Sequence, residues 1–395
     1  MAKLFAAKYI DLFSLHDTLS ILGIIFWANA EGDRFGVLNN KSPYNFVVDD
    51  TVPLPNLNPT KEYKMREIIM FRAYEILKKA RNNKKKLAIL WSGGVDSTCM
   101  LSAFLLAGAT KEELIILCTQ NSINEYQRGY IYLKNNLHLD FNVYDWTDSL
   151  KVYDMFGEDV YFIPGWCADQ LFGSNVNLLY PDLYNKYWKD GLRYIINNHI
   201  INKMKIKIEE KEIKNTIDDF EMYSKRLGLP LKYTCDALWM LNFCIKWSHV
   251  SRDFAMTILS DVQRKNIINF FEGINFQEWS IMNYKEFHKH NQATDPKNYK
   301  RPFKELIYEV FKDRFYLENK GKVNSWISVR KGLQYSFLTI WDSDGTFVTH
   351  DILNSDRNYK TNNPALIQKY NKRKYSLPYL KDWVDKERFL TGEIW

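Results

Sequence analysis

The fold of this chain is decided by Leu87-Ala-Ile-Leu-Trp-Ser92-Gly93-Gly94-Val95-Asp96-Ser97-Thr98. An apolar run typical of a buried strand leads into two glycines, and the residues that follow are suited to a helix. Gly93 and Gly94 let the backbone bend sharply and let a bulky anion come close. The start of a helix offers N–H groups and the positive end of its dipole, which together bind phosphate. The stretch therefore predicts a strand, a phosphate-binding loop and a helix.

The polar side chains of this loop agree with that prediction. Ser92 and Ser97 add hydroxyl donors for phosphate. Asp96 would repel a phosphate unless a divalent cation lay between them, so we interpret it as a Mg²⁺ ligand. The alternative is a plain connection in which Ser97 only caps the helix. A Ser-Gly-Gly-x-Asp-Ser sequence arises by chance in a chain of this size with odds on the order of one in a thousand, which favours the phosphate site.

The regions around the loop indicate the fold class. Apolar runs at residues 87–91, 114–119, 141–146 and 160–164 alternate with segments of helical length. This alternation predicts βαβ units and an α/β fold with a parallel sheet covered on both faces. We expect four parts: a mixed N-terminal segment (1–60), an α/β core (61–180), a helical substrate region (181–313) and a β-rich C-terminal part (314–395). The last contains a predicted hairpin at residues 335–349.

Composition limits the classes of protein. The 395 residues are 46% hydrophobic and 26% charged, which excludes a disordered tail or a fibrous repeat. The net charge of +7 is mild and does not by itself indicate nucleic-acid binding. No signal peptide or membrane span is predicted, so we expect a cytoplasmic protein without a membrane partner. The cysteines are scattered and predict neither a zinc site nor disulfides: Cys99, Cys118, Cys167, Cys235 and Cys244.

The loop at residues 92–97 resembles the pyrophosphate-binding loop of the PP-loop ATP pyrophosphatases. The resemblance implies a fold of the adenine nucleotide alpha hydrolase-like type, with ATP and Mg²⁺ as cofactors. In that family the loop holds the β- and γ-phosphates while a nucleophile attacks the α-phosphate, which gives an adenylated intermediate and pyrophosphate. A kinase-type loop would require Gly-Lys-[Ser/Thr], and this sequence contains none.

A second stretch indicates the branch of that family. Residues 164–174, Pro-Gly-Trp-Cys-Ala-Asp-Gln-Leu-Phe-Gly-Ser, resemble the Gly-Glu-Gly-Ala-Asp-Glu-Leu-Phe-Gly-Gly loop of asparagine synthetases and β-lactam synthetases. The resemblance implies that Asp169 is a second Mg²⁺ ligand and completes a clamp on the pyrophosphate with Asp96. It also implies that the backbone near Leu90 and Gly165 flanks the adenine. A family lysine that steadies charge on the α-phosphate falls near Lys304, with Lys300 and Arg301 as the fallback positions.

The chain also departs from that family. Trp166 stands where the family has a glutamate that helps to deprotonate the incoming amine, and Gln170 replaces another carboxylate. Ala2 stands where glutamine-dependent members have a nucleophilic cysteine, so we expect no glutaminase activity. The expected enzyme is an asparagine synthetase-like ligase that adenylates a carboxylate or amide acceptor, after which a nitrogen nucleophile displaces AMP.

Two other functions remain open at this level. One alternative to the ligase is a nucleotide-binding module within a larger assembly. Such a module would bind the nucleotide without catalysing a reaction, which agrees with the loss of two carboxylates at Trp166 and Gln170. The other alternative is a tRNA- or DNA-modifying ATP pyrophosphatase that uses the mild basic excess to hold the nucleic acid. Cys118 and Cys167 fall near predicted strand ends, where they either transfer sulfur or fill space as small apolar side chains. The sequence does not identify the acceptor, which is a small molecule or a macromolecule, nor the nitrogen source or the oligomeric state.

Overall fold

The computed structural model describes residues 3–7, 34–35, 47–48, 52–144, 158–173, 181–203, 208–247, 250, 265–286, 296–321, 337–341 and 347–351. The chain divides into two compact units. One contains Asn58–Phe172 and Leu259–Ser325, and we call it the sheet unit. The other contains Met1–Leu57, Gly173–Ile258 and Trp326–Trp395, and we call it the helical unit. In the described part of the chain, no helix has both the length and the apolar character needed to cross a membrane.

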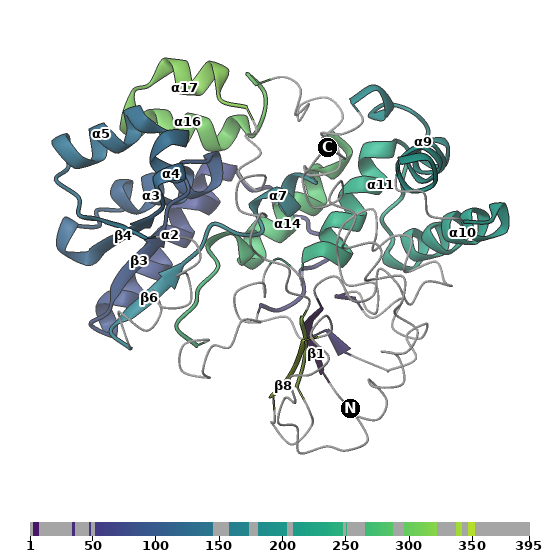
Figure 1. Cartoon of the computed structure of the whole chain (residues 1–395), viewed down its shortest axis with the longest axis horizontal. Coiled ribbons are helices and arrows are strands. Elements are labelled where there is room, and N and C mark those ends of the chain that lie inside the picture. Colours follow the sequence, from purple (N-terminus) through teal and green to yellow (C-terminus); the bar gives the residue numbers. More distant parts are fainter. Residues whose placement is uncertain are drawn as a thin grey trace. The chain divides into compact units, whose positions relative to one another are not determined.

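A parallel sheet lies at the centre of the sheet unit. Among the described residues it has four strands in the order β5-β4-β3-β6, all parallel to their neighbours. The strands are β3 (Lys86–Leu90), β4 (Leu114–Cys118), β5 (Phe141–Val143) and β6 (Val160–Ile163). Figure 1 shows β3, β4 and β6 next to one another. The predicted α/β class with a parallel sheet is confirmed.

Burial explains why these segments form strands and helices. Leu87, Ala88 and Ile89 of β3 are inaccessible to solvent, as expected for a parallel sheet covered by helices. The helix α2 (Met65–Asn82) buries apolar residues that recur at helical spacing along one face. The helix α3 (Val95–Leu106) is buried nearly all round, because α2 and α16 (Arg301–Phe311) both pack against it.

The order of the strands creates a special position at one edge of the sheet. From β3 the chain proceeds outward through β4 and β5, and then returns to place β6 on the opposite side of β3. In an open parallel sheet, the crevice outside the carboxyl ends of the strands at such a reversal is where ligands bind. The loops that follow β3 and β6 begin at this position, and they are the two loops singled out in the sequence.

The sheet unit extends further along the chain than the predicted core of residues 61–180. The unit also includes a later segment, Leu259–Ser325. Phe162 of β6 forms two backbone hydrogen bonds with that segment, donating to Asn266 O and accepting from Ile268 N, both at 2.9 Å. The segment then supplies α14 (Ile274–Asn283), α16 and α17 (Arg314–Asn319). The contact units group Leu259–Ser325 with the sheet, whereas the predicted parts at 181–313 and 314–395 stay a prediction.

The remaining described elements complete both units. In the sheet unit they are η3 (Lys111–Glu113), α4 (Gln120–Glu125), α5 (Gln127–Asn136), α7 (Ala168–Phe172), η8 (Phe270–Glu272) and η9 (Tyr284–Glu286). In the helical unit they are η5 (Pro181–Leu183), α9 (Trp188–Ile195), η6 (Ile196–Lys203), α10 (Glu210–Leu227), α11 (Thr234–Leu241) and η7 (Asn242–Lys246). The helical unit also has a sheet in the order β2-β1-β7-β8, from β1 (Lys3–Ala7), β2 (Val47–Val48), β7 (Phe337–Trp341) and β8 (Phe347–Asp351).

Most of the two terminal segments lies outside the described residues. Strands β7 and β8 pair antiparallel over the range where a hairpin is expected. Residues 314–319 lie within the predicted β-rich part, and they form the helix α17. A β-rich C-terminal part as a whole stays a prediction, as does a mixed segment at residues 1–60.

Candidate functional site

The loop after β3 requires glycine at its first bend. Gly93 has a φ of +75°, a conformation that residues with a side chain rarely adopt. A Cβ at this position would lie 2.3 Å from the backbone oxygen of Ser122, which is far inside van der Waals contact. Gly94 follows as the N-cap of α3 and offers no capping side chain. The helix therefore begins on a bare backbone, as an anion-binding loop requires.

The two predicted serines hold this loop together. The hydroxyl of Ser97 accepts a hydrogen bond from the backbone N–H of Ser92 at 3.0 Å and lies 2.9 Å from the Ser92 hydroxyl. The backbone N–H of Gly94 donates to the Ser92 hydroxyl at 3.3 Å. Behind the loop, buried Trp91 donates from Nε1 to Thr98 Oγ1 at 3.1 Å. The serines therefore shape the loop as well as lining it.

The two predicted Mg²⁺ ligands meet at a single ammonium group. Lys300 Nζ lies 2.6 and 2.7 Å from the carboxylate oxygens of Asp96 and 2.5 Å from Asp169 Oδ1. The Lys300 side chain is fully buried, whereas those of Asp96 and Asp169 are 25% and 17% exposed. Residues that are 73 positions apart in the sequence thus share one cation at the strand-order reversal.

The second loop also touches the first through its backbone. A Cβ on Gly165 would lie 3.3 Å from the backbone nitrogen of Ser97 and 3.5 Å from the carbonyl carbon of Asp96. Two residues later, Cys167 has a φ of +69°, which is uncommon for a residue with a side chain. Asp169 then lies in the first turn of α7. The absence of a side chain at Gly165 lets the two loops approach this closely.

Lys300 is held in place by an unusual backbone. It is the N-cap of α16 and adopts the left-handed region, with φ 46° and ψ 41°. Such a conformation costs a residue with a side chain about 1–2 kcal/mol. Burial by itself lowers the pKa of Lys300, but the charges of Asp169 and Asp96 outweigh burial and raise it well above 10.5. Lys300 is therefore a permanent cation between the two carboxylates.

The ammonium of Lys304, the lysine that the family resemblance favours, contacts backbone oxygens. Its side chain is fully buried, and its ammonium donates to the backbone oxygens of Pro296, Lys297 (3.2 Å) and Lys320 (3.4 Å). It ties the chain before α16 to the chain after α17. Of the fallback residues, Arg301 pairs with Glu305 and Glu318. Lys300, the other fallback residue, contacts the carboxylates of Asp96 and Asp169.

The sequence did not predict a second ion pair that lies at the glycine loop. Lys320 Nζ donates to Glu125 Oε1 at 3.0 Å, and the two side chains are only 10% and 11% exposed. The same Glu125 oxygen is 3.2 Å from where a Cβ on Gly94 would lie. The two residues are 195 positions apart and belong to no recognisable motif, so only the fold brings them to the loop.

The remaining predicted residues fit the surroundings of this site. Leu90 is the last residue of β3 and pairs with Leu117 of β4. Trp166 is half-buried, and Gln170 is buried with no hydrogen-bond partner for its Oε1 within the described residues. The cysteines offer little for sulfur transfer, because Cys118 and Cys167 are both buried. Burial also raises the pKa of Cys118 to about 11, which keeps it protonated near neutral pH.

The residues present fit a magnesium ion that arrives with a nucleotide. Among the described residues, no group of three or more His, Cys, Asp or Glu side chains could hold a metal by itself. Mg²⁺ does not need such a group, because it is usually held by one or two carboxylates together with substrate phosphates and water. Asp96 and Asp169 supply such a pair of carboxylates beside a loop suited to phosphate.

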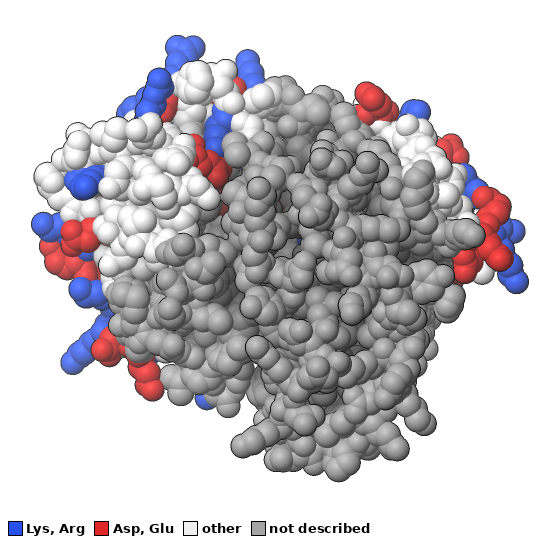
Figure 2. All heavy atoms as spheres, viewed as in Figure 1, with Lys and Arg blue, Asp and Glu red and all other residues white. Residues whose placement is uncertain are grey.

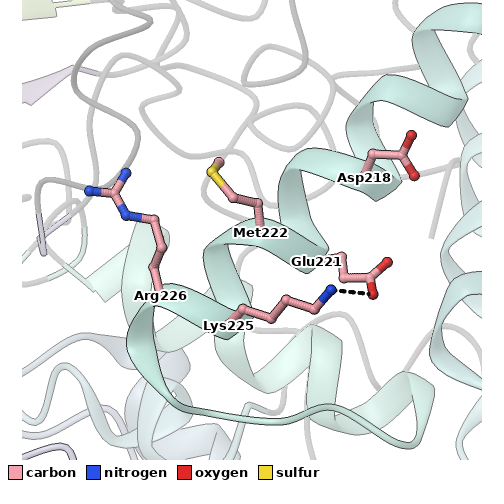
Figure 3. A pocket seen from close by; sticks show the side chains of 5 residues that line it. All are labelled: Asp218, Glu221, Met222, Lys225 and Arg226. Atoms are coloured by element: carbon pink, nitrogen blue, oxygen red, sulfur yellow. Dashed lines mark ion pairs between the residues drawn. The ribbon is translucent and has the colours of Figure 1, made fainter.

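A hollow on the helical unit is less suited to chemistry. It lies along α10 and is lined by Asp218, Glu221, Met222, Lys225 and Arg226 (Figure 3). Its central carboxylate, Glu221, already pairs with Lys225 at 3.0 Å and also with Lys189. Among the described residues, all five lining side chains come from a single helix.

No known family model matches this chain, and no curated protein matches it.

Proposed function

We propose that this protein is an ATP-dependent enzyme of the PP-loop type that transfers an adenylyl group to an acceptor and releases pyrophosphate. One observation carries the proposal: Asp96 and Asp169 converge on Lys300 beside a glycine loop, where the strand order reverses. Two loops that sequence alone linked to the same triphosphate are thus neighbours in the fold.

The charges at the site support a requirement for magnesium. Asp96, Asp169 and Glu125 carry three negative charges, and Lys300 and Lys320 carry two positive ones. These five groups together leave one net negative charge, which repels a polyphosphate. A bound Mg²⁺ would neutralise charge on the β- and γ-phosphates, and Asp96 and Asp169 are the residues that would hold it. Lys300 keeps these two carboxylates together.

Each part of the loop has a task in this proposal. The backbone from Gly93 to the first turn of α3 receives the terminal phosphates, because glycine leaves it accessible and no side chain caps the helix. Gly165 and Leu90 flank the base, as the family resemblance implies. The same resemblance directs attack to the α-phosphate. Trp166 cannot accept a proton, so the nucleophile must arrive neutral or be deprotonated by another group.

Labelled nucleotide tests the reaction type. The full-length protein is incubated with α-labelled MgATP, ammonium ions and a panel of carboxylate and amide acceptors. The proposal expects AMP and pyrophosphate in equal amounts when the right acceptor is present. Release of ADP would contradict it, because ADP reports attack on the γ-phosphate.

Substitution of the carboxylates tests the site. Asp96→Asn and Asp169→Asn should each lower turnover at least 100-fold, because each removes one of two ligands for the metal. Asp218→Asn on the exposed face of α10 is the matched control and should leave the rate unchanged. Circular dichroism checks that the variants stay folded. Either site variant with the full rate would remove that carboxylate from the proposed mechanism.

A binding module without turnover is the second candidate. Trp166 and Gln170 favour it, because both stand where the resembling family has carboxylates. Nucleotide binding with no pyrophosphate release for any acceptor would support this alternative.

A nucleic-acid substrate is a third candidate. On the described surface in Figure 2, basic and acidic side chains are interspersed. Steep weakening of tRNA or DNA binding by salt would support such a substrate.

A further inference from the structure

Glu125 places a carboxylate against the loop that is proposed to bind phosphate. It is the last residue of α4, and its Cβ is 3.2 Å from where a Cβ on Gly93 would lie. Its Oε1 is at the same distance from the corresponding position on Gly94. A carboxylate this close to an anion site, and nearly nine-tenths buried, opposes a polyphosphate unless another group offsets its charge.

Lys320 offsets that charge with an ammonium at the end of a long side chain. Its backbone is fixed at the end of α17, where its N–H donates to Tyr316 O at 3.0 Å and its carbonyl accepts from Lys304 Nζ. The ammonium at the end of the side chain is held by Glu125 at 3.0 Å. A lysine head group on four methylenes can move to a nearby anion while its backbone stays in place.

We propose that Glu125 is a positioning residue: it holds the Lys320 ammonium beside the glycine loop until the phosphates of an incoming nucleotide take that ammonium over. The inference rests on the proposed ATP site and concerns how tightly that site binds phosphate groups. Glu125 and the phosphates compete for one cation, so Glu125 weakens the binding of phosphate-bearing ligands and promotes the release of pyrophosphate. Ligands without phosphate are unaffected.

Calorimetric titration of the full chain with MgATP, magnesium pyrophosphate and adenosine tests this competition. Glu125→Gln keeps the shape and an oxygen acceptor but removes the charge. It should bind MgATP and pyrophosphate about tenfold more tightly and adenosine with unchanged affinity. In a turnover assay it should lower KM for ATP and also lower kcat, because the pyrophosphate leaves more slowly. A merely structural role would instead weaken the binding of all three ligands together.

Lys320→Met provides an independent arm if Glu125→Gln does not fold. It should bind MgATP about tenfold more weakly and adenosine as the wild type does. If the wild type binds MgATP and either variant binds it with wild-type affinity, the competition is wrong while the ATP site stands. If the wild type binds neither MgATP nor pyrophosphate, the proposed function fails and the role of Glu125 fails with it.

Discussion

Lys300 and Lys304 lie one helical turn apart at the start of α16, and both side chains are fully buried, yet their partners differ in kind. The ammonium of Lys300 contacts two carboxylates, whereas that of Lys304 contacts backbone oxygens. Lys300 neutralises part of the negative charge of two carboxylates, and this neutralisation is lost when the lysine is replaced. Lys304 instead satisfies backbone carbonyl groups by hydrogen bonds. Burial and sequence position therefore do not identify a functional lysine, because the role depends on which groups the fold places around the ammonium.

Removing the Lys300 charge should have the largest effect. In Lys300→Met, Asp96 and Asp169 lose the cation that they share while both carboxylates stay partly buried. The free energy of unfolding should fall by about 3 kcal/mol, as when one member of a buried ion pair is lost. Urea denaturation of wild type and variant measures this difference.

The double variant Lys300→Met/Asp169→Asn shows whether charge is the cause. It removes the charge of one of the two carboxylates that lose the Lys300 ammonium, so it should recover about 1 kcal/mol relative to Lys300→Met. If the single variant loses less than about 1 kcal/mol, the carboxylates reach water and the balance inferred for the site is wrong.

The corresponding change at the second lysine should have a smaller effect. Lys304→Met leaves the oxygens of Pro296, Lys297 and Lys320 without this donor and should cost about 1–2 kcal/mol in the free energy of unfolding. Because the Lys304 ammonium is directed at backbone oxygens, kcat should stay within about twofold of the wild type. Steady-state pyrophosphate release measures kcat, and a loss of several orders of magnitude would restore Lys304 to the role that the family resemblance implied.

The smallest effect is expected from pH. The pKa of Lys300 is raised in the folded chain, so its stabilising contribution is fully present below the ordinary lysine value of 10.5 and is lost as the pH rises through the folded-state value. The stability difference between wild type and Lys300→Met should therefore be constant from about pH 6 to 9 and shrink only above about pH 10.5. Urea denaturation of both proteins across this range measures it. A difference that already shrinks near pH 8 would mean that Lys300 loses its proton and is not a permanent cation.

Much of the sheet unit could be predicted from the sequence. Glycines after an apolar run predicted the loop at residues 92–97, and the alternation of apolar runs predicted a parallel sheet that the structure contains. Such local patterns are informative because few residue types are tolerated there. The strand β3 is buried on both faces and accepts apolar residues, and the positive φ at position 93 favours glycine. Asp96 and Asp169 each lie in the first helical turn after a strand of the sheet, so their meeting was predictable once the strands were assigned.

The charged partners of the site could not be predicted in the same way. Lys300 and Lys320 come from a segment more than 120 residues beyond Asp169, and their approach depends on α16 packing against α3 and on the edge pairing of β6. Nothing in the local sequence distinguishes Lys300 from Lys304. The extent of the sheet unit was missed for the same reason, because a late segment returns to a sheet that formed much earlier in the chain.

Position 300 has two requirements that conflict: a left-handed backbone and a positive charge next to Asp96 and Asp169. Glycine and asparagine adopt this conformation easily, but neither brings a positive charge to Asp96 and Asp169. Among the cationic residues, arginine would place a bulkier, branched head group in a space that holds a single ammonium. A saturation library at position 300 would therefore separate variants that gain thermal stability from variants that keep the carboxylates balanced. Lysine is the compromise in which a local conformational penalty is accepted for a charge at one fixed point.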